Sequence, residues 1–343
     1  MKKKKNIFNF ILFILIFLIM LRLLGKMFIP KADSDVYYKN EIYKKGYDLD
    51  YIGAGCSEMN RGISPMIIWN QTGYTGYNIG SSGERIYTTY YSLKSVLEYT
   101  KPKYVFLSTE IIDKKYPLNK YLLRQNWERK PINFASLEMM TNENHKFDIF
   151  EYIHSFFPIF AYHQQWKHIE KEPEDYRTKG HYVRAKNYQK KRPTEENFNK
   201  YFKKTDKRKK INKLNIKYLL KINELLKSKN IKLVIVGFPN INTYSYSIHN
   251  TIKDIAEKNN IEFIDFNEHM DEYKLDYKMD FEDTTHLNGL GAKKLSTFIA
   301  DYLKSKDELV DKRNDPKFDT WNKDYDVYMK HYNSVVDTIK AEE

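Results

Sequence analysis

The feature that most constrains this chain is an almost unbroken apolar run from Ile7 to Leu24, interrupted only by Asn9 and Arg22. A helix of this length is long enough to cross the hydrocarbon core of a lipid bilayer. Because Lys2 to Lys5 precede the run, the amino terminus should stay in the cytoplasm and everything after about Pro30 should lie outside the cell. No small-residue cleavage site follows, so we expect an uncleaved single-pass membrane anchor; the alternative is a cleaved secretory signal.

The composition limits what the rest of the chain can be. Its 343 residues suffice for one large α/β domain with an elaboration. Cys56 is the only cysteine, so no intramolecular disulfide can form. A net charge of +13 would suggest nucleic acid in the cytosol, but outside the cell the available polyanions are lipid headgroups and phosphate-bearing wall polymers. The lysine-rich segment 203–213 is equally compatible with solvated surface. No nucleic-acid partner, metal or cofactor is expected, since no zinc, calcium, Walker or dinucleotide signature appears.

After the anchor, short apolar runs alternate with segments whose apolar residues recur at helical spacing. Strands are predicted at 49–54, 77–79, 104–107, 232–236 and 262–266, and helices at 65–73, 85–99, 214–227, 248–258 and 290–303. This alternation predicts an α/β fold with a five-stranded parallel sheet that is covered by helices on both faces.

The same reading divides the chain into five parts. Residues 1–30 hold the lysines and the anchor, 31–47 a stalk, and 48–111 with 214–305 the α/β domain. Residues 112–213 are rich in aromatic and basic side chains and show no alternation of strands and helices, so we interpret them as an insertion over the carboxyl edge of the sheet. Residues 306–343 form a polar extension, in which Asp315 to Tyr328 should wrap back before a final short helix.

One serine follows the first predicted strand at a sharp turn. The strand breaks at Gly53 and Gly55, and Ser57 lies just beyond. A serine hydroxyl is a weak nucleophile unless a base removes its proton, and the loop after the fifth strand offers Asp283 and His286. Each has an ordinary interpretation, as a turn residue, a helix cap or a surface histidine. Because the carboxyl ends of parallel strands meet at one edge, however, all three are expected to meet there.

These positions predict a separate catalytic role for each residue. His286 would take the proton of Ser57 as the serine attacks an ester or thioester carbonyl, and Asp283 would orient the imidazole. The backbone N–H groups of Ser57 and Gly80 are the expected oxyanion donors. Glu110 and Asn240, which follow the third and fourth strands, are candidates to contact the substrate.

Three segments carry a resemblance to a known family. GCSEMNRGISP, YNIGSSG and DTTHLNGLGAKKLSTFIADYL resemble the first, second and fifth sequence blocks of the SGNH (GDSL-type) hydrolase superfamily. The nearest likeness is to its membrane-anchored extracytoplasmic branch, which includes the D-alanine transfer protein of lipoteichoic-acid synthesis and alginate-type O-acetylation proteins. The resemblance covers 49–111 and 214–303 and implies a flavodoxin-like three-layer fold. It also implies Ser57 as nucleophile, Gly80 as oxyanion glycine, Asp283 as orienting acid and His286 as base.

Two positions depart from the family pattern. Cys56 replaces the aspartate that usually precedes the nucleophile, and Glu110 stands near the place of the oxyanion asparagine. An ionised carboxylate cannot donate a hydrogen bond, which disfavours efficient hydrolysis and favours acyl transfer.

The expected function is therefore a serine acyltransferase that moves an acetyl or D-alanyl group onto a hydroxyl of an anionic or glycan cell-surface polymer. The resemblance implies a membrane-bound O-acyltransferase as partner. The alternatives are an esterase that removes such groups and a catalytically silent module that binds the polymer.

Overall fold

The computed structural model describes residues 2–29, 40–114, 120–128, 130–142, 148–168, 177–185, 193–241 and 243–341. Most of the predicted stalk lies outside these residues. Its last part holds a short 3₁₀ turn, Asn40–Tyr43.

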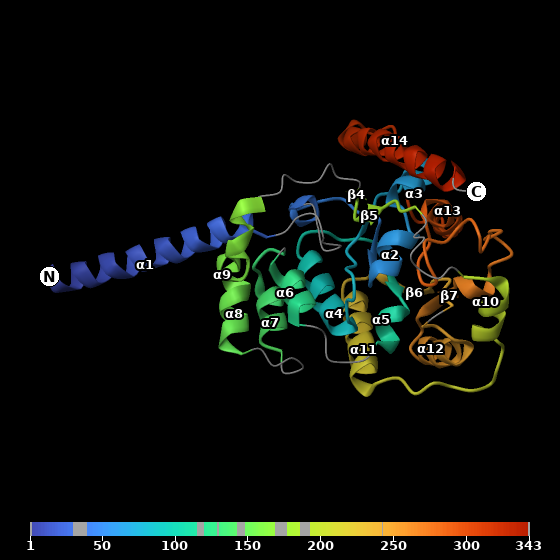
Figure 1. Ribbon diagram of the computed structural model, residues 1–343, viewed down its shortest axis with the longest axis horizontal. Coiled ribbons are helices and arrows are strands. Elements are labelled where there is room, and N and C mark those ends of the chain that lie inside the picture. The colour runs from blue at the N-terminus through green and yellow to red at the C-terminus, as the bar shows by residue number, and fades with distance from the viewer. Residues whose placement is uncertain are drawn as a thin grey trace.

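A five-stranded sheet organises the molecule (Figure 1). Its strands are β1 (Tyr51–Ala54), β2 (Gly76–Asn78), β3 (Tyr104–Ser108), β6 (Lys232–Gly237) and β7 (Glu262–Asp265). All neighbours pair in parallel, in the order β2-β1-β3-β6-β7. This order places the first strand inside the sheet and is the flavodoxin-like order of doubly wound folds. The predicted α/β class and five-stranded parallel sheet are confirmed.

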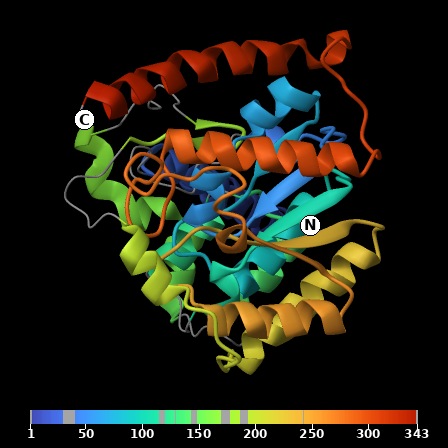
Figure 2. The same cartoon turned by 90° about the vertical axis from the view of Figure 1, so that its right-hand side faces the viewer.

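Helices cover both faces, as Figure 2 shows. One face carries α3 (Pro65–Thr72) and α13 (Gly289–Ser305), and the other carries α4 (Ile86–Val96), α11 (Lys213–Lys227) and α12 (Tyr246–Lys258). The start of α3 follows local rules: Ser64 caps it by accepting a hydrogen bond from the Ile67 N–H, and Pro65 occupies its first position. It ends at Gly73, whose φ of 72° suits glycine.

The insertion does not form a single cover over the carboxyl edge. Its first part packs beside α4 and comprises α6 (Lys120–Glu128), α7 (Phe134–Met140), α8 (Ile149–Phe156), α9 (Pro158–Tyr162) and the 3₁₀ helix η2 (His163–His168). Its second part lies at the carboxyl edge and comprises the hairpin of β4 (Arg177–Thr178) and β5 (His181–Tyr182), with α10 (Glu195–Tyr201).

The carboxyl-terminal extension corrects the expectation of a short final helix. The chain forms a long helix, α14 (Asp319–Ala341), that lies across α3 and α13 as an outer layer (Figure 2). The predicted anchor coincides with helix α1 (Lys2–Met27), which includes a 25-residue stretch of mean hydropathy 2.8 whose most apolar window is not buried. Its length and composition suit a membrane span, whereas its retention as an uncleaved anchor and the direction of crossing stay predictions.

Candidate active site

Ser57 lies at the junction between strand β1 and helix α2 (Ser57–Gly62). Strand β1 ends at Ala54, and Gly55 then turns the chain with a φ of 145°. A Cβ on Gly55 would lie 2.6 Å from the Ser108 Cβ, so only glycine allows β1 and β3 to approach here. Ser57 is the first residue of α2 and is 9% exposed. The turn therefore presents its hydroxyl at the carboxyl edge of the sheet.

The structure brings Ser57, His286 and Asp283 into one hydrogen-bonded relay. The Ser57 Oγ lies 2.8 Å from the His286 Nε2, and the His286 Nδ1 lies 2.9 Å from the Asp283 Oδ1. Because an ionised carboxylate can only accept, we assign the ring proton to Nδ1, which leaves Nε2 to accept the serine proton. This is the arrangement that a nucleophilic serine, its base and an orienting acid require. The catalytic roles of the three residues stay predictions.

A tight loop explains how a carboxylate only three residues from His286 reaches its ring. The Asp283 Oδ1 accepts the backbone N–H groups of Thr285 and His286, at 2.8 and 3.0 Å. It also accepts the Thr285 hydroxyl at 2.9 Å. A bridge between Phe281 and Leu287 closes the base of the loop. Asp283 thus fixes the loop and the ring together. Sequence reasoning missed Thr285, because a hydroxyl between two stronger candidates gives no signal of its own.

Gly80 lies against the loop that carries Ser57. The N–H groups of Ile79 and Ser81 donate to the carbonyls of Gly53 and Gly55, at 2.7 and 3.2 Å. A Cβ on Gly80 would lie 2.9 Å from the Cys56 carbonyl oxygen, so a side chain would push the two segments apart. The Gly80 carbonyl accepts the Asn60 amide at 2.7 Å. Proximity to Ser57 agrees with the predicted oxyanion role, and donation by the Gly80 and Ser57 N–H groups stays a prediction.

Glu110 belongs to a buried charged cluster behind Ser57. Its carboxylate pairs with the Lys114 ammonium at 2.5 Å and accepts the Cys56 thiol. Burial alone would raise the pKa of Glu110, but Lys114 and the thiol outweigh burial and lower it. Glu110 is therefore ionised and cannot donate to an oxyanion. Burial, together with the Glu110 charge, raises the pKa of the Cys56 thiol well above its usual range, which argues against Cys56 as the nucleophile.

Asn240 lies in the same region, where its side-chain amide is hydrogen-bonded to a second carboxylate, that of Glu58. Its amide donates to the Glu58 Oε1 at 2.5 Å and to the Thr243 hydroxyl at 2.9 Å. Burial, reinforced by Glu110, raises the pKa of Glu58 well above its usual range. Neither Asn240 nor Glu110 is joined to Ser57 or His286 by a hydrogen bond among those described. The sequence did not point to Glu58, because a glutamate is usually exposed on the surface and nothing in the sequence indicates that this one is buried.

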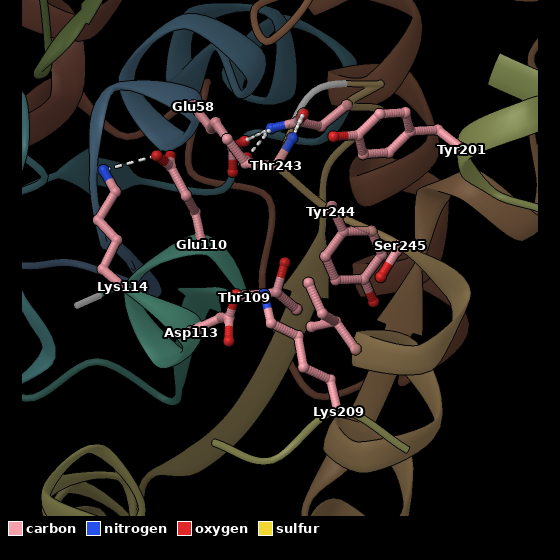
Figure 3. Close-up of a pocket in the computed structure, with 12 residues that line it drawn as sticks. Glu58, Thr109, Glu110, Asp113, Lys114, Tyr201, Lys209, Thr243, Tyr244 and Ser245 are labelled. Atoms are coloured by element: carbon pink, nitrogen blue, oxygen red, sulfur yellow. Dashed lines mark hydrogen bonds and ion pairs between the residues drawn. The ribbon is translucent and has the colours of Figure 1, made fainter. Parts of the chain in front are cut away.

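These groups line a cavity of about 580 Å³ (Figure 3). Glu58 and Glu110 lie next to each other in its wall, with Lys114 beside Glu110, and Asn240 is joined to Glu58 by its hydrogen bond. Tyr201 of α10 projects into the same region from the insertion. The predicted substrate residues thus lie in a pocket wall next to the Ser57 helix, and their contact with substrate stays a prediction.

The same three side chains could also face a metal ion, since Cys56, Glu58 and Glu110 offer ligand atoms within 4.8 Å of one another. In the structure these atoms interact with protein groups: the Cys56 thiol donates to Glu110, Lys114 pairs with Glu110, and Asn240 donates to Glu58.

Comparison with known proteins gives a distant likeness among the solved structures. No protein-family model and no curated protein sequence matches the chain. Among solved structures, the crystal structure of an acetyl xylan esterase is similar at 15% identity and a TM-score of 0.35, with 75% of this chain and 98% of that chain covered.

Proposed function

We propose that the protein is an extracytoplasmic serine acyltransferase that works through an acyl-Ser57 intermediate. The observation that carries the proposal is the relay in which the Ser57 Oγ lies 2.8 Å from the His286 Nε2 and the His286 Nδ1 lies 2.9 Å from Asp283. Membership of the SGNH superfamily is part of the proposal and rests on the three sequence blocks around these residues.

The proposed reaction has two steps. In the first, the Ser57 Oγ attacks the carbonyl carbon of an ester or thioester donor while its proton passes to the His286 Nε2. The tetrahedral intermediate expels the donor's alcohol or thiol, which takes that proton. In the second, a hydroxyl of the polymer gives its proton to His286 and attacks the acyl carbon, and the Ser57 oxygen leaves and is reprotonated. Asp283 stabilises the imidazolium in both steps.

The partition between transfer and hydrolysis depends on the oxyanion site. Glu110 is ionised and supplies no donor, so the site has the backbone N–H groups of Ser57 and Gly80 to rely on. Loss of one oxyanion donor costs about 3–4 kcal/mol of barrier in comparable sites. This favours a highly activated donor over a simple ester, as transfer requires. The alternatives are an esterase that deacylates a surface glycan and, if the weakened site is inactive, a polymer-binding module.

The anchor supplies the proposed setting. With α1 across the membrane and the lysines Lys2 to Lys5 in the cytoplasm, the domain lies outside the cell. There it would receive an acetyl or D-alanyl group from a membrane-bound O-acyltransferase and pass it to an anionic or glycan polymer.

An activated-serine probe tests the relay. We expect a fluorophosphonate to label the full-length protein in detergent once, as intact-mass analysis would show, with peptide mapping locating the adduct on Ser57. Ser57→Ala should abolish labelling, whereas Cys56→Ala should retain it because the thiol is buried and held protonated. A folded wild-type protein that takes up no label would leave only the binding module.

Acceptor competition then separates the two enzymatic readings. A transferase should release acid slowly from an aryl acetate in water and form acetylated polyol when a hydroxyl acceptor is added. Rapid acid release that the acceptor does not divert would identify an esterase.

A further inference from the structure

The membrane helix leads directly onto the insertion. Near its end, the Arg22 guanidinium donates to the Phe156 carbonyl at 2.7 Å. One turn later, a Cβ on Gly25 would lie 2.7 Å from the Ile159 backbone nitrogen, so α1 and α9 touch backbone to backbone. The bilayer surface, which α1 must leave near this point, therefore lies close to α8 and α9.

Well-exposed large apolar side chains gather in the same region. Outside α1, eight of the eleven such residues among the described part of the chain lie between 132 and 166. Five of the eight follow one another on α8, α9 and η2, and we call them the interfacial patch: Ile149, Phe150, Ile153, Phe160 and Trp166, which are 66%, 67%, 37%, 49% and 61% exposed. Charged residues are sparse here, since Glu151 and Lys167 are the two among residues 149–168, in a chain that is 30% charged.

Helix α8 has a polar face and a broad apolar face, and the domain covers only part of the apolar face. Phe156 meets Trp127 with ring centroids 5.3 Å apart, and the Trp127 indole donates to the Ser155 carbonyl at 3.0 Å. Ile149, Phe150 and Ile153 are exposed. An amphipathic helix with an exposed apolar face is suited to a membrane surface, and these three side chains have no protein over them among the described residues.

The orientation of these helices fits a membrane surface. Figure 1 shows α1 extending away from the domain, while α8 and α9 run across its direction in this view. If α1 crosses the bilayer, α8 and α9 lie beside the point where α1 leaves it, as interfacial helices do.

We propose that the interfacial patch is buried in the headgroup region of the leaflet from which α1 emerges, with lipid as its occupant. The tryptophan suits this depth, because indole combines an apolar body with a polar N–H. The domain is then attached at two places, by α1 and by the patch, which holds it at a fixed height and tilt over the bilayer. This inference assumes no catalytic activity.

The four tryptophans provide a direct test. Trp69, Trp127 and Trp321 are 1%, 1% and 3% exposed, whereas Trp166 is 61% exposed. Full-length protein is reconstituted into phosphatidylcholine nanodiscs whose acyl chains carry bromine at a shallow or a deep position. We expect bromine at the shallow position to quench the tryptophan emission more strongly than bromine at the deep position. In Trp166→Phe this quenching should disappear, because the three remaining tryptophans are buried in the protein. Absence of quenching at both depths would overturn the proposal and leave the patch to a protein or polymer.

A matched pair of variants checks the patch itself. Phe150→Glu/Ile153→Glu should at least halve the shallow quenching of Trp166, because two charges must leave the interface. Val327→Glu adds a charge at an equally apolar and exposed position of α14, which is 58% exposed, and should leave the quenching unchanged. Circular dichroism confirms folding of each variant. Equal quenching in the folded double variant and wild type would refute the proposal.

Discussion

At the scale of single residues, the sequence was enough to predict that three residues of the candidate site lie close together. It was not enough to predict which side chains surround them. Ser57, Asp283 and His286 could be predicted because each follows a strand of one parallel sheet. Thr285 and Glu58 could not, because their contribution depends on hydrogen bonds to atoms that only the folded loops bring near. Short-range chemistry of this kind leaves no periodic trace in a sequence.

Asp283→Asn tests whether the carboxylate does more than shape its loop. The amide oxygen can still accept the backbone N–H groups of Thr285 and His286, but it cannot stabilise an imidazolium. We expect labelling of Ser57 by the fluorophosphonate to slow by about 10²- to 10⁴-fold with little loss of thermal stability. Glu282→Gln removes the neighbouring charge, which pairs with Arg61, and should label near the wild-type rate. Equal rates in Asp283→Asn and wild type would exclude an electrostatic role.

His181 couples folding to pH. It is fully buried, its Nδ1 donates to the Asn60 carbonyl at 2.7 Å, and burial lowers its pKa from 6.5 to about 4. Below about pH 6.5, His181 binds a proton in the unfolded chain but stays neutral in the folded chain. The free energy of unfolding should therefore fall as the pH drops from 6.5 to 4. The loss should approach about 3 kcal/mol.

Urea unfolding of the wild type and of His181→Gln across this pH range measures that contribution. The variant should show a shallower fall, since its side chain has no proton to bind. Parallel curves for the two proteins would show that His181 binds its proton equally well in the folded and the unfolded state, and would contradict the lowered pKa.

At the scale of elements, regular strands and caps were predictable and the outer layers were not. The five strands are apolar runs that end at turn residues, and helix α3 is bounded by Ser64 and Gly73 as its sequence indicates. The helices of the insertion are five to nine residues long, so a periodic face repeats too few times in each of them to stand out in the sequence. Helix α14 did carry a signal, because its buried residues recur at helical spacing, with gaps of seven, four, four and three positions: Trp321, Tyr328, Tyr332, Val336 and Ile339. Its polar composition hid that pattern.

Helix α14 is held to the domain through its first turn. The ring centroids of Trp321 and of Trp69 in α3 lie 5.4 Å apart. The Lys179 ammonium lies 4.5 Å from the centroid of the Trp321 ring. Lys179 also pairs with Asp324 at 2.8 Å and Glu41 at 3.1 Å. One lysine thus ties α14, the hairpin and the segment after the anchor together.

Trp321→Ala should destabilise this layer. Removing a buried indole costs about 3–5 kcal/mol in typical cores, and the buried Lys179 also loses its ring partner. We expect the free energy of unfolding in detergent to fall by about that amount, measured by urea titration with circular dichroism. Val327→Ala, on an exposed face of the same helix, should change it by less than about 0.5 kcal/mol. Similar stabilities for both variants would mean that α14 is only loosely attached.

At the scale of the whole molecule, the chain is arranged around its sheet, with α1, α8 and α9 at one side and the carboxyl-terminal helix α14 at another (Figure 1). The sequence predicted the sheet and the anchor separately, because each depends on hydropathy within a short window. It could not predict that α1 lies against α9, since that contact joins residues far apart in the chain. The interfacial patch likewise becomes apparent only when burial is known.

The strand order has a consequence for how the protein is made. Strand β3 at the centre of the sheet pairs with β6 only after the whole insertion has been synthesised. Until then, β3 leaves an unpaired edge on the sheet of the first three strands, to which another chain could add. His286 is synthesised later still, after β7, so a partly synthesised chain has Ser57 without the histidine that the proposed function assigns as its base. If the proposed function holds, reactivity at this serine reports that the sheet is complete.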